Sequence, residues 1–304
     1  MSRQQQPRRP APPPGLLIVD KPAGMTSHDV VARARRIMGT RKVGHAGTLD
    51  PMATGVLVLG IERATKLLGH LALDRKTYLA TISLGSSTTT DDAEGEPLAT
   101  AAPAVVDAVT DDAIAAGIAA LTGEIQQRPS AVSAVKVDGK RAYARVRAGE
   151  EVELAARPVT VYRFDLLATR RSPGGIELDV VVECSSGTYV RALARDLGVA
   201  LGTGGHLAAL RRTTVGPFTL AAARTLDVLE DHPELSFDLD KAVATAFPRR
   251  DVDGATARAV RHGQRIPAAG VGGTYGVFDP DGHVLALAAD DGSVARAVVV
   301  LLPA

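Results

Sequence analysis

Alternation of apolar and polar residues over strand length is the feature that most constrains the fold of this 304-residue chain. Within residues 176–184, every second position is apolar: Ile176, Leu178, Val180, Val182 and Cys184. Successive side chains of a β-strand point to opposite faces, so these residues share one face and predict a half-buried strand. Residues 76–84 (KTYLATISL) alternate in the same way, and residues 159–169 predict a strand paired with 176–184.

Helical patterns occur between the predicted strands, which indicates an α+β fold with a large mixed β-sheet flanked by helices. Ser27 is a candidate N-cap for a helix that ends at Gly39. Thr110 precedes a second predicted helix over residues 111–123, which has acids in its first turn. Residues 85–109 are rich in Gly, Ser, Thr, Asp and Pro, and predict a long acidic loop.

Composition shifts divide the chain into three parts. Residues 1–14 contain five Pro and three Arg and predict a disordered tail. Residues 15–248 form the predicted main domain. Residues 249–304 consist of short β-type runs separated by Gly and Asp-Gly turns, which predicts a small β-rich domain.

Several function classes lack their sequence signals. The longest apolar runs fall short of the ~18 residues that a membrane helix requires, and the N-terminus has no secretory signal, so we expect a cytoplasmic protein without membrane contact. The single cysteine excludes a disulfide framework. Phosphate-loop, HExxH and Gly-x-Ser-x-Gly motifs are absent, so we expect neither a cofactor nor a metal.

Charge is distributed unevenly although the net charge is only +1. Residues 1–50 have a net charge of +6, residues 85–125 have −8, and residues 126–147 have +5. Clusters of basic residues are what contacts with nucleic-acid phosphates require. Solvated surface charge explains the pattern equally well, so charge alone leaves both interpretations open.

The segment GHAGTLDPMATG (44–55) is the strongest candidate for chemistry. Its glycines allow tight backbone shapes, and Pro51 favours extended geometry at Asp50. The Asp50 carboxylate would then project from a restricted backbone, as a nucleophile requires. An ordinary Asp-Pro turn is the alternative interpretation.

This segment, extended to GHAGTLDPMATGVLVL, resembles the signature loop of the TruB family of pseudouridine synthases. Four further segments resemble motifs of that family in the same order: DKPAGMTSHDVV (20–31), KTYLATISLG (76–85), SSGTYVRALARDLG (185–198) and GGHLAALRRTTVGPF (204–218). The stretch 128–149 is similar to the RNA-contacting stretch of the family. The resemblance implies a pseudouridine synthase-like catalytic domain over 15–248, and residues 249–304 resemble, more loosely, a PUA-type RNA-binding domain.

The resemblance implies an isomerase that converts uridine 55 in the T-loop of tRNA to pseudouridine without a cofactor. Asp50 matches the catalytic aspartate of the family. Arg191 matches its active-site arginine, which can hold Asp50 ionised and oriented through a bidentate pair. Tyr78 matches the tyrosine that packs on the target base and helps to remove the C5 proton. Whether the aspartate attacks C1′ of the ribose or C6 of the base stays open.

Four further residues match substrate-binding positions of the family. Tyr189 and Leu210 match positions that line the uracil pocket, and Lys21 matches a lysine near the active site. His45 matches the histidine that fills the gap left by the flipped base. The basic stretch 128–147 would follow the RNA backbone.

The resemblance implies a monomer that acts on the T-arm stem-loop without an obligatory protein partner. An RNA chaperone that refolds tRNA, with catalysis secondary, is the competing hypothesis. The set of Asp50, Tyr78 and Arg191 favours the enzyme, because a protein that only binds RNA would not need it. A carboxylate glycosidase is a third hypothesis, but it would require a second carboxylate near Asp50.

Overall fold

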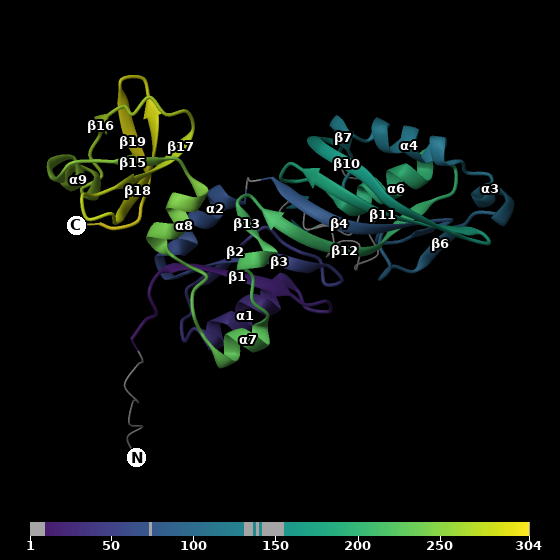
Figure 1. Ribbon diagram of the computed structural model, residues 1–304, viewed down its shortest axis with the longest axis horizontal. Coiled ribbons are helices and arrows are strands. Elements are labelled where there is room, and N and C mark those ends of the chain that lie inside the picture. The colour runs from purple at the N-terminus through teal and green to yellow at the C-terminus, as the bar shows by residue number, and fades with distance from the viewer. Residues whose placement is uncertain (1–9, 73–74, 131–135, 138–139, 142–154, 304) are drawn as a thin grey trace, which may run out of the picture. The chain divides into compact units, whose positions relative to one another are not determined.

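The structure is a computed structural model that describes residues 10–72, 75–130, 136–137, 140–141 and 155–303. Most of the predicted RNA-contacting stretch and the first nine residues of the predicted tail therefore lie outside the described residues. The chain divides into two compact units (Figure 1). Unit 1 comprises Met1–Pro51, Gly55–Ala72 and Val215–Ala304, and unit 2 comprises Met52–Thr54 and Leu73–Thr214.

Unit 1 contains the strands that lead into and out of the Asp50 loop. Its strands pair in the order β14 (Phe237–Asp238), β1 (Gly15–Lys21), β3 (Thr54–Ile61) and β2 (Val43–Ala46). Helix α1 (Ser27–Ile37) packs beside α7 (Leu226–Asp231), and Arg33 on α1 contacts Asp227 and Glu230 at 2.7 Å each. The remaining elements near these strands are η1 (Glu62–Leu67), α2 (Leu68–Leu71), β13 (Phe218–Thr219), η2 (Leu220–Ala222) and α8 (Leu239–Ala246).

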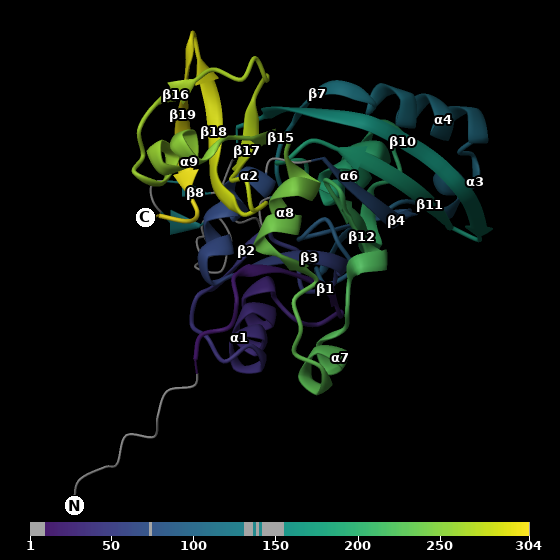
Figure 2. The same cartoon turned by 60° about the vertical axis from the view of Figure 1, so that its left-hand side comes forward.

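The C-terminal part of unit 1 is a five-stranded sheet, as the β-type runs predict. Its order is β15 (Arg249–Asp251), β17 (Thr274–Phe278), β18 (Val284–Asp291), β19 (Val294–Val300) and β16 (Ile266–Pro267). Helix α9 (Gly254–Arg261) lies beside this sheet (Figure 2) and was not expected. Asp253 caps it by accepting a hydrogen bond from the Thr256 amide at 2.7 Å, and Ala257 and Val260 bury its apolar face.

One apolar core joins the C-terminal sheet to the first strands of the chain. It contains Leu16 and Ile18 of β1 together with Phe278, Leu287 and Leu301. Burial of apolar surface is the main stabilising term in a core of this kind. The predicted boundary at residues 248 and 249 stays a prediction, and this core extends across it.

Unit 2 is built on the alternating strands. Their order is β12 (Gly205–Val215), β4 (Lys76–Leu84), β11 (Gly175–Cys184), β10 (Arg157–Ser172) and β7 (Gly123–Gln127). The predicted pairing of 159–169 with 176–184 is confirmed as an antiparallel β10–β11 pair. The predicted apolar face of β11, from Ile176 to Cys184, is buried throughout. Helices α4 (Asp111–Ala120) and α6 (Val190–Ala200) pack on each other and on strands of this sheet.

Two local predictions were wrong. Thr26, and not Ser27, caps α1, because Asp29 returns a hydrogen bond to the Thr26 amide and completes a capping box. The predicted loop 85–109 contains regular elements: β5 (Ser86–Thr88), β6 (Pro97–Thr100) and α3 (Pro103–Asp107). β5 and β6 pair with each other, so the backbone hydrogen bonds come from a partner strand that the local composition does not reveal.

The α+β class, with a large sheet flanked by helices and a β-rich C-terminal segment, is confirmed. The strands β8 (Lys136–Val137) and β9 (Lys140–Arg141) pair antiparallel and complete the described elements of unit 2. Among the described residues, no helix combines the length and the apolar character that crossing a bilayer demands.

Candidate functional site

The Asp50 loop is held by hydrogen bonds to the backbone on both sides of Asp50. On one side, the Ser27 hydroxyl donates to the Leu49 carbonyl at 3.1 Å and accepts from the Leu49 amide at 2.9 Å. On the other side, the Pro51 carbonyl accepts from the Gly24 amide at 2.8 Å. Asp50 itself is half-buried. The carboxylate therefore projects from a segment whose two neighbouring peptides are fixed.

Lys21 supports the same segment from the end of β1. Its side chain is fully buried, and Nζ donates to the carbonyl oxygens of Pro22 (2.9 Å), Met25 (2.7 Å) and Pro51 (3.1 Å). Three acceptors match the three N–H donors of an ammonium group, which is the condition for burying such a charge. Lys21 thus connects the 22–25 turn to the residue that follows Asp50.

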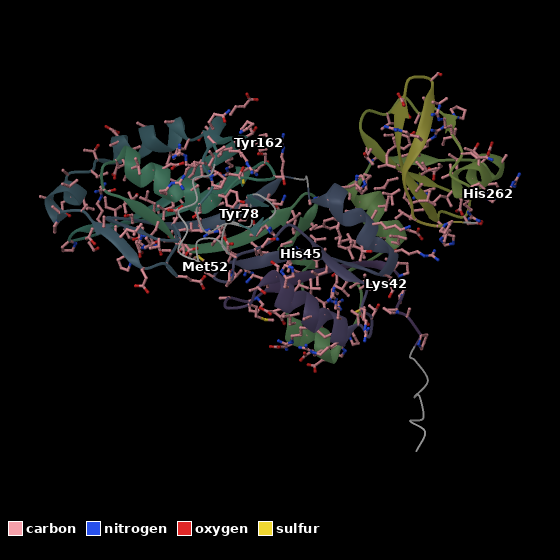
Figure 3. The ribbon with its side chains drawn as sticks, turned by 180° about the vertical axis from the view of Figure 1, so that it is seen from behind. Lys42, His45, Met52, Tyr78, Tyr162 and His262 are labelled. Atoms are coloured by element: carbon pink, nitrogen blue, oxygen red, sulfur yellow. The ribbon has the colours of Figure 1, made fainter. Side chains whose placement is uncertain are left out.

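His45 lies on β2, five residues before Asp50, and is labelled in Figure 3. It is half-buried, and its ring stands edge-on to the ring of His28, with centroids 5.5 Å apart and an interplanar angle of 81°. Edge-to-face contact is a favourable arrangement for planar rings. The contact orients His45 from the first turn of α1.

Arg191 belongs to unit 2 and lies on the first turn of α6. Its side chain is buried, and Nη1 donates to the Thr90 carbonyl at 2.9 Å and to Oδ2 of Asp92 at 3.1 Å. Asp92 is buried as well, and its Oδ1 accepts from the Glu94 amide at 3.1 Å. Burial strengthens the attraction between the two charges and makes the loss of either partner costly.

Tyr189 immediately precedes α6 and is positioned through its backbone. The buried Gln127 side chain accepts from the Tyr189 amide at 2.8 Å and donates to the Tyr189 carbonyl at 3.1 Å. One amide side chain thereby satisfies both backbone groups of Tyr189. Gln127 ends strand β7, so this contact ties the start of α6 to the edge of the unit 2 sheet.

Tyr78 and Leu210 come from strands of unit 2. Tyr78, labelled in Figure 3, lies on β4 opposite Val182 of β11 and is buried on the apolar face that the alternation predicts. Leu210 is buried on β12.

The candidate residues thus fall into two groups. Unit 1 carries Lys21, His45 and Asp50, and unit 2 carries Tyr78, Tyr189, Arg191 and Leu210. The pairing of Arg191 with Asp50 stays a prediction; Thr90 and Asp92 are among the partners of Arg191.

Three supporting residues were missed by sequence reasoning: Ser27 as a contact of the Asp50 loop, Asp92 and Gln127. Asp92 stands beside Asp91 in a polar segment, and nothing in the local sequence distinguishes the two. The sequence predicts Ser27 as the helix cap, a role that the adjacent Thr26 fills.

The part of the chain that the structure describes contains no group of three or more His, Cys, Asp or Glu side chains placed to hold a metal ion.

Models of known protein families match nearly the whole chain. Residues 35–190 match the family described as "TruB family pseudouridylate synthase (N terminal domain)". Residues 191–243 match "tRNA pseudouridylate synthase B C-terminal domain", and residues 247–302 match "tRNA Pseudouridine synthase II, C terminal".

Two curated relatives are both named tRNA pseudouridine synthase B. The protein from Nocardia farcinica is 64% identical over 97% of this chain and 96% of its own length. The protein from Rhodococcus jostii is 60% identical over 100% of this chain and 99% of its own length. Among solved structures, a chain of a Cbf5-Nop10-Gar1 complex matches with a TM-score of 0.70 and 27% identity, covering 95% of this chain and 85% of that chain.

Proposed function

The chain belongs to the TruB family of pseudouridylate synthases and is a tRNA pseudouridine synthase, and on that premise we propose that it isomerises uridine 55 of the T-loop. The reaction breaks the bond between N1 of uracil and C1′ of ribose, turns the base, and forms a C5–C1′ bond. A proton leaves C5 and N1 gains one, so the product is an isomer of the substrate. No electron acceptor or group donor is required.

Asp50 is the proposed nucleophile, and the observation that carries this role is the two-sided support of its loop. Ser27 holds Leu49, whereas Lys21 and Gly24 hold Pro51. A nucleophile held close to its attack geometry loses little entropy when it reacts. The carboxylate attacks either C1′ of the ribose or C6 of the base, and both routes use the same rigid support.

Arg191 and Tyr78 are proposed to complete the chemistry. A guanidinium beside the nucleophile would keep the Asp50 carboxylate ionised and oriented. The ion pair with Asp92 supports this role, because it fixes the guanidinium on a rigid helix start. Tyr78 would pack on the uracil ring and assist removal of the C5 proton.

Recognition of the target requires that the uridine leave the base stack. We assign His45 to the gap that the flipped base leaves, because its ring is planar and is already oriented by His28. Tyr189 and Leu210 would line the uracil pocket. Lys21 is assigned a supporting role through its three carbonyl contacts.

The enzyme is proposed to act in the cytoplasm as a monomer, on the T-arm, without an obligatory protein partner. The basic residues of 128–147 would contact phosphates, and such contacts make affinity fall with salt concentration. The C-terminal sheet would add further RNA contacts.

The direct test is conversion of an unmodified T-arm stem-loop by the purified protein, followed by carbodiimide-stop sequencing. We expect one new stop, at uridine 55, and none in a matched stem-loop that carries cytidine there. A new stop at another uridine would support pseudouridine synthase activity but would reject uridine 55 as the target. Conversion of full-length tRNA but not of the stem-loop would reject the T-arm as the sufficient substrate.

A further inference from the structure

The Ser27 hydroxyl contacts both backbone groups of the residue before Asp50. It donates to the Leu49 carbonyl at 3.1 Å and accepts from the Leu49 amide at 2.9 Å. The Ser27 residue is 1% exposed and Leu49 is also buried. The hydroxyl satisfies both the amide and the carbonyl of Leu49. Because the contact is buried, water cannot replace either hydrogen bond, so the backbone at Leu49 is strongly restricted.

The Ser27 hydroxyl is available to bond Leu49 because the adjacent Thr26 caps helix α1. Thr26 accepts from the Asp29 amide at 3.1 Å, and the Asp29 carboxylate accepts from the Thr26 amide at 2.9 Å. Ser27 is the first residue of α1, and the buried side chains of Val30, Val31 and Ala34 anchor this helix in unit 1. The hydroxyl therefore sits on an element whose packing does not depend on the loop.

We propose that Ser27 is a positioning residue for Asp50: it fixes the Leu49 peptide and thereby the direction in which the carboxylate leaves the backbone. This inference rests on the proposed function, in which Asp50 is the nucleophile. The Pro51 carbonyl is held independently by Lys21 and Gly24. Without the Ser27 hydroxyl, the segment stays anchored on the Pro51 side and gains freedom on the Leu49 side, so the carboxylate departs from its attack geometry.

The test compares Ser27→Ala with Thr26→Ala, its neighbour on the same helix start. Ser27→Ala removes both bonds to Leu49, whereas Thr26→Ala removes the cap and leaves those bonds in place. Three quantities are measured for each full-length variant: the single-turnover rate on a T-arm stem-loop, the affinity for unmodified tRNA, and the midpoint of thermal unfolding.

We expect Ser27→Ala to lower the single-turnover rate by about 10- to 100-fold, the range for small misplacements of a reacting group. Its tRNA affinity should stay within about twofold of wild type, because the hydroxyl makes its bonds inside the protein. Thr26→Ala should lower the unfolding midpoint with an unchanged rate, since it removes the side-chain cap of α1 and leaves the contact of Ser27 with Leu49 in place. Ser27→Cys, which keeps a weak donor and acceptor, should recover part of the rate.

A wild-type rate for Ser27→Ala would overturn the proposal. So would an equal loss of rate in Thr26→Ala, because the effect would then follow helix stability and not the contact with Leu49. If Ser27→Ala does not fold, Ser27→Cys carries the comparison, and a Ser27→Cys rate equal to wild type at a lower unfolding midpoint would reject positioning. The Asp50→Asn variant distinguishes failure of the proposed function from failure of this inference. A fully active Asp50→Asn variant rejects Asp50 as the nucleophile. An inactive Asp50→Asn variant together with a Ser27→Ala variant of normal rate rejects only the positioning role of Ser27.

Discussion

Arg191 and Asp92 form an ion pair at 3.1 Å in which the two side chains are only 6% and 3% exposed. One helical turn further along α6, Arg195 pairs with Asp91 at 3.0 Å, and those side chains are 23% and 14% exposed. Two consecutive aspartates thus contact two arginines spaced four residues apart, which lie on one face of a helix. The pairs bind the 90–92 segment to α6, and the more deeply buried pair holds the proposed catalytic arginine.

Asp92→Asn is expected to destabilise the protein by about 3 kcal/mol, because it leaves a buried guanidinium without the carboxylate charge opposite it. Asp91→Asn is the matched control, and its more exposed pair should cost about 1 kcal/mol or less. Urea denaturation of both variants measures the difference. Asp92→Asn should also slow conversion of the stem-loop, because Arg191 loses part of its support. Equal losses of stability in the two variants would contradict this account.

Asp50→Asn is expected to abolish pseudouridine formation and to leave tRNA binding within about twofold of wild type. The amide keeps the size of the side chain but lacks the charge that a nucleophile needs. Conversion of a T-arm stem-loop and tRNA affinity are measured on the same preparation. The two measurements also separate catalysis from RNA-chaperone activity, because the inactive variant should still bind. Turnover near the wild-type rate would remove Asp50 from the mechanism.

Removal of residues 249–304 is expected to unfold unit 1. Phe278, Leu287 and Leu301 share a core with β1, and each buried side chain of this kind contributes about 1.5–3 kcal/mol. Circular dichroism and thermal unfolding of the truncated chain test this. A truncated chain that unfolds at the wild-type temperature would show that the shared core contributes little.

RNA contacts of the C-terminal sheet are therefore better tested by point substitutions. Arg258 and Arg265 are exposed, whereas Arg249 contacts Asp251 at 2.8 Å and stacks over the Phe278 ring at 4.1 Å. Alanine at 258 and 265 should weaken tRNA binding and reduce its salt dependence, since each lost phosphate contact lowers the slope by about 1. Arg249→Ala is the comparison variant and should change the slope less. An unchanged slope in the double variant would exclude these two arginines from the RNA contact.

His283 is expected to make the stability of unit 1 depend on pH near neutrality. Its Nδ1 lies 3.0 Å from Oδ2 of Asp240, and this hydrogen bond raises the pKa of His283 above its usual value. A raised pKa means that the protonated imidazole favours the folded state. The stabilisation is complete below the ordinary histidine pKa of about 6.5 and is lost as the pH rises through the raised value.

His283→Gln should consequently lower the unfolding midpoint at pH 6 and have a smaller effect at pH 8.5. Differential scanning calorimetry of the wild type and the variant at both pH values measures this. The direct contact is with Asp240, so Asp240→Asn should remove the same pH-dependent difference. A His283→Gln effect of equal size at both pH values would assign the change to packing and not to charge.

Local sequence was sufficient for the strands with a strict apolar alternation and for the candidate loop. The alternation from Ile176 to Cys184 predicted a strand with one buried face, and that strand exists with that face buried. The alternation of apolar and polar residues is a pattern among neighbouring residues, so the sequence alone is enough to predict the strand and its buried face. The same holds for the loop around Asp50, where the glycines allow tight turns and Pro51 restricts the backbone of Asp50 before any tertiary contact forms.

Tertiary structure alone decided which of two chemically similar neighbours takes each supporting role. Ser27 contacts Leu49, 22 residues away, while Thr26 caps the helix; Asp92 pairs with Arg191, 99 residues away, while Asp91 pairs with Arg195. Composition and spacing do not distinguish such neighbours, because either hydroxyl can cap the helix and either carboxylate can pair with an arginine. The choice depends on which side chain the strand order and helix packing bring close to a distant backbone or guanidinium group, and that information lies in the folded chain as a whole.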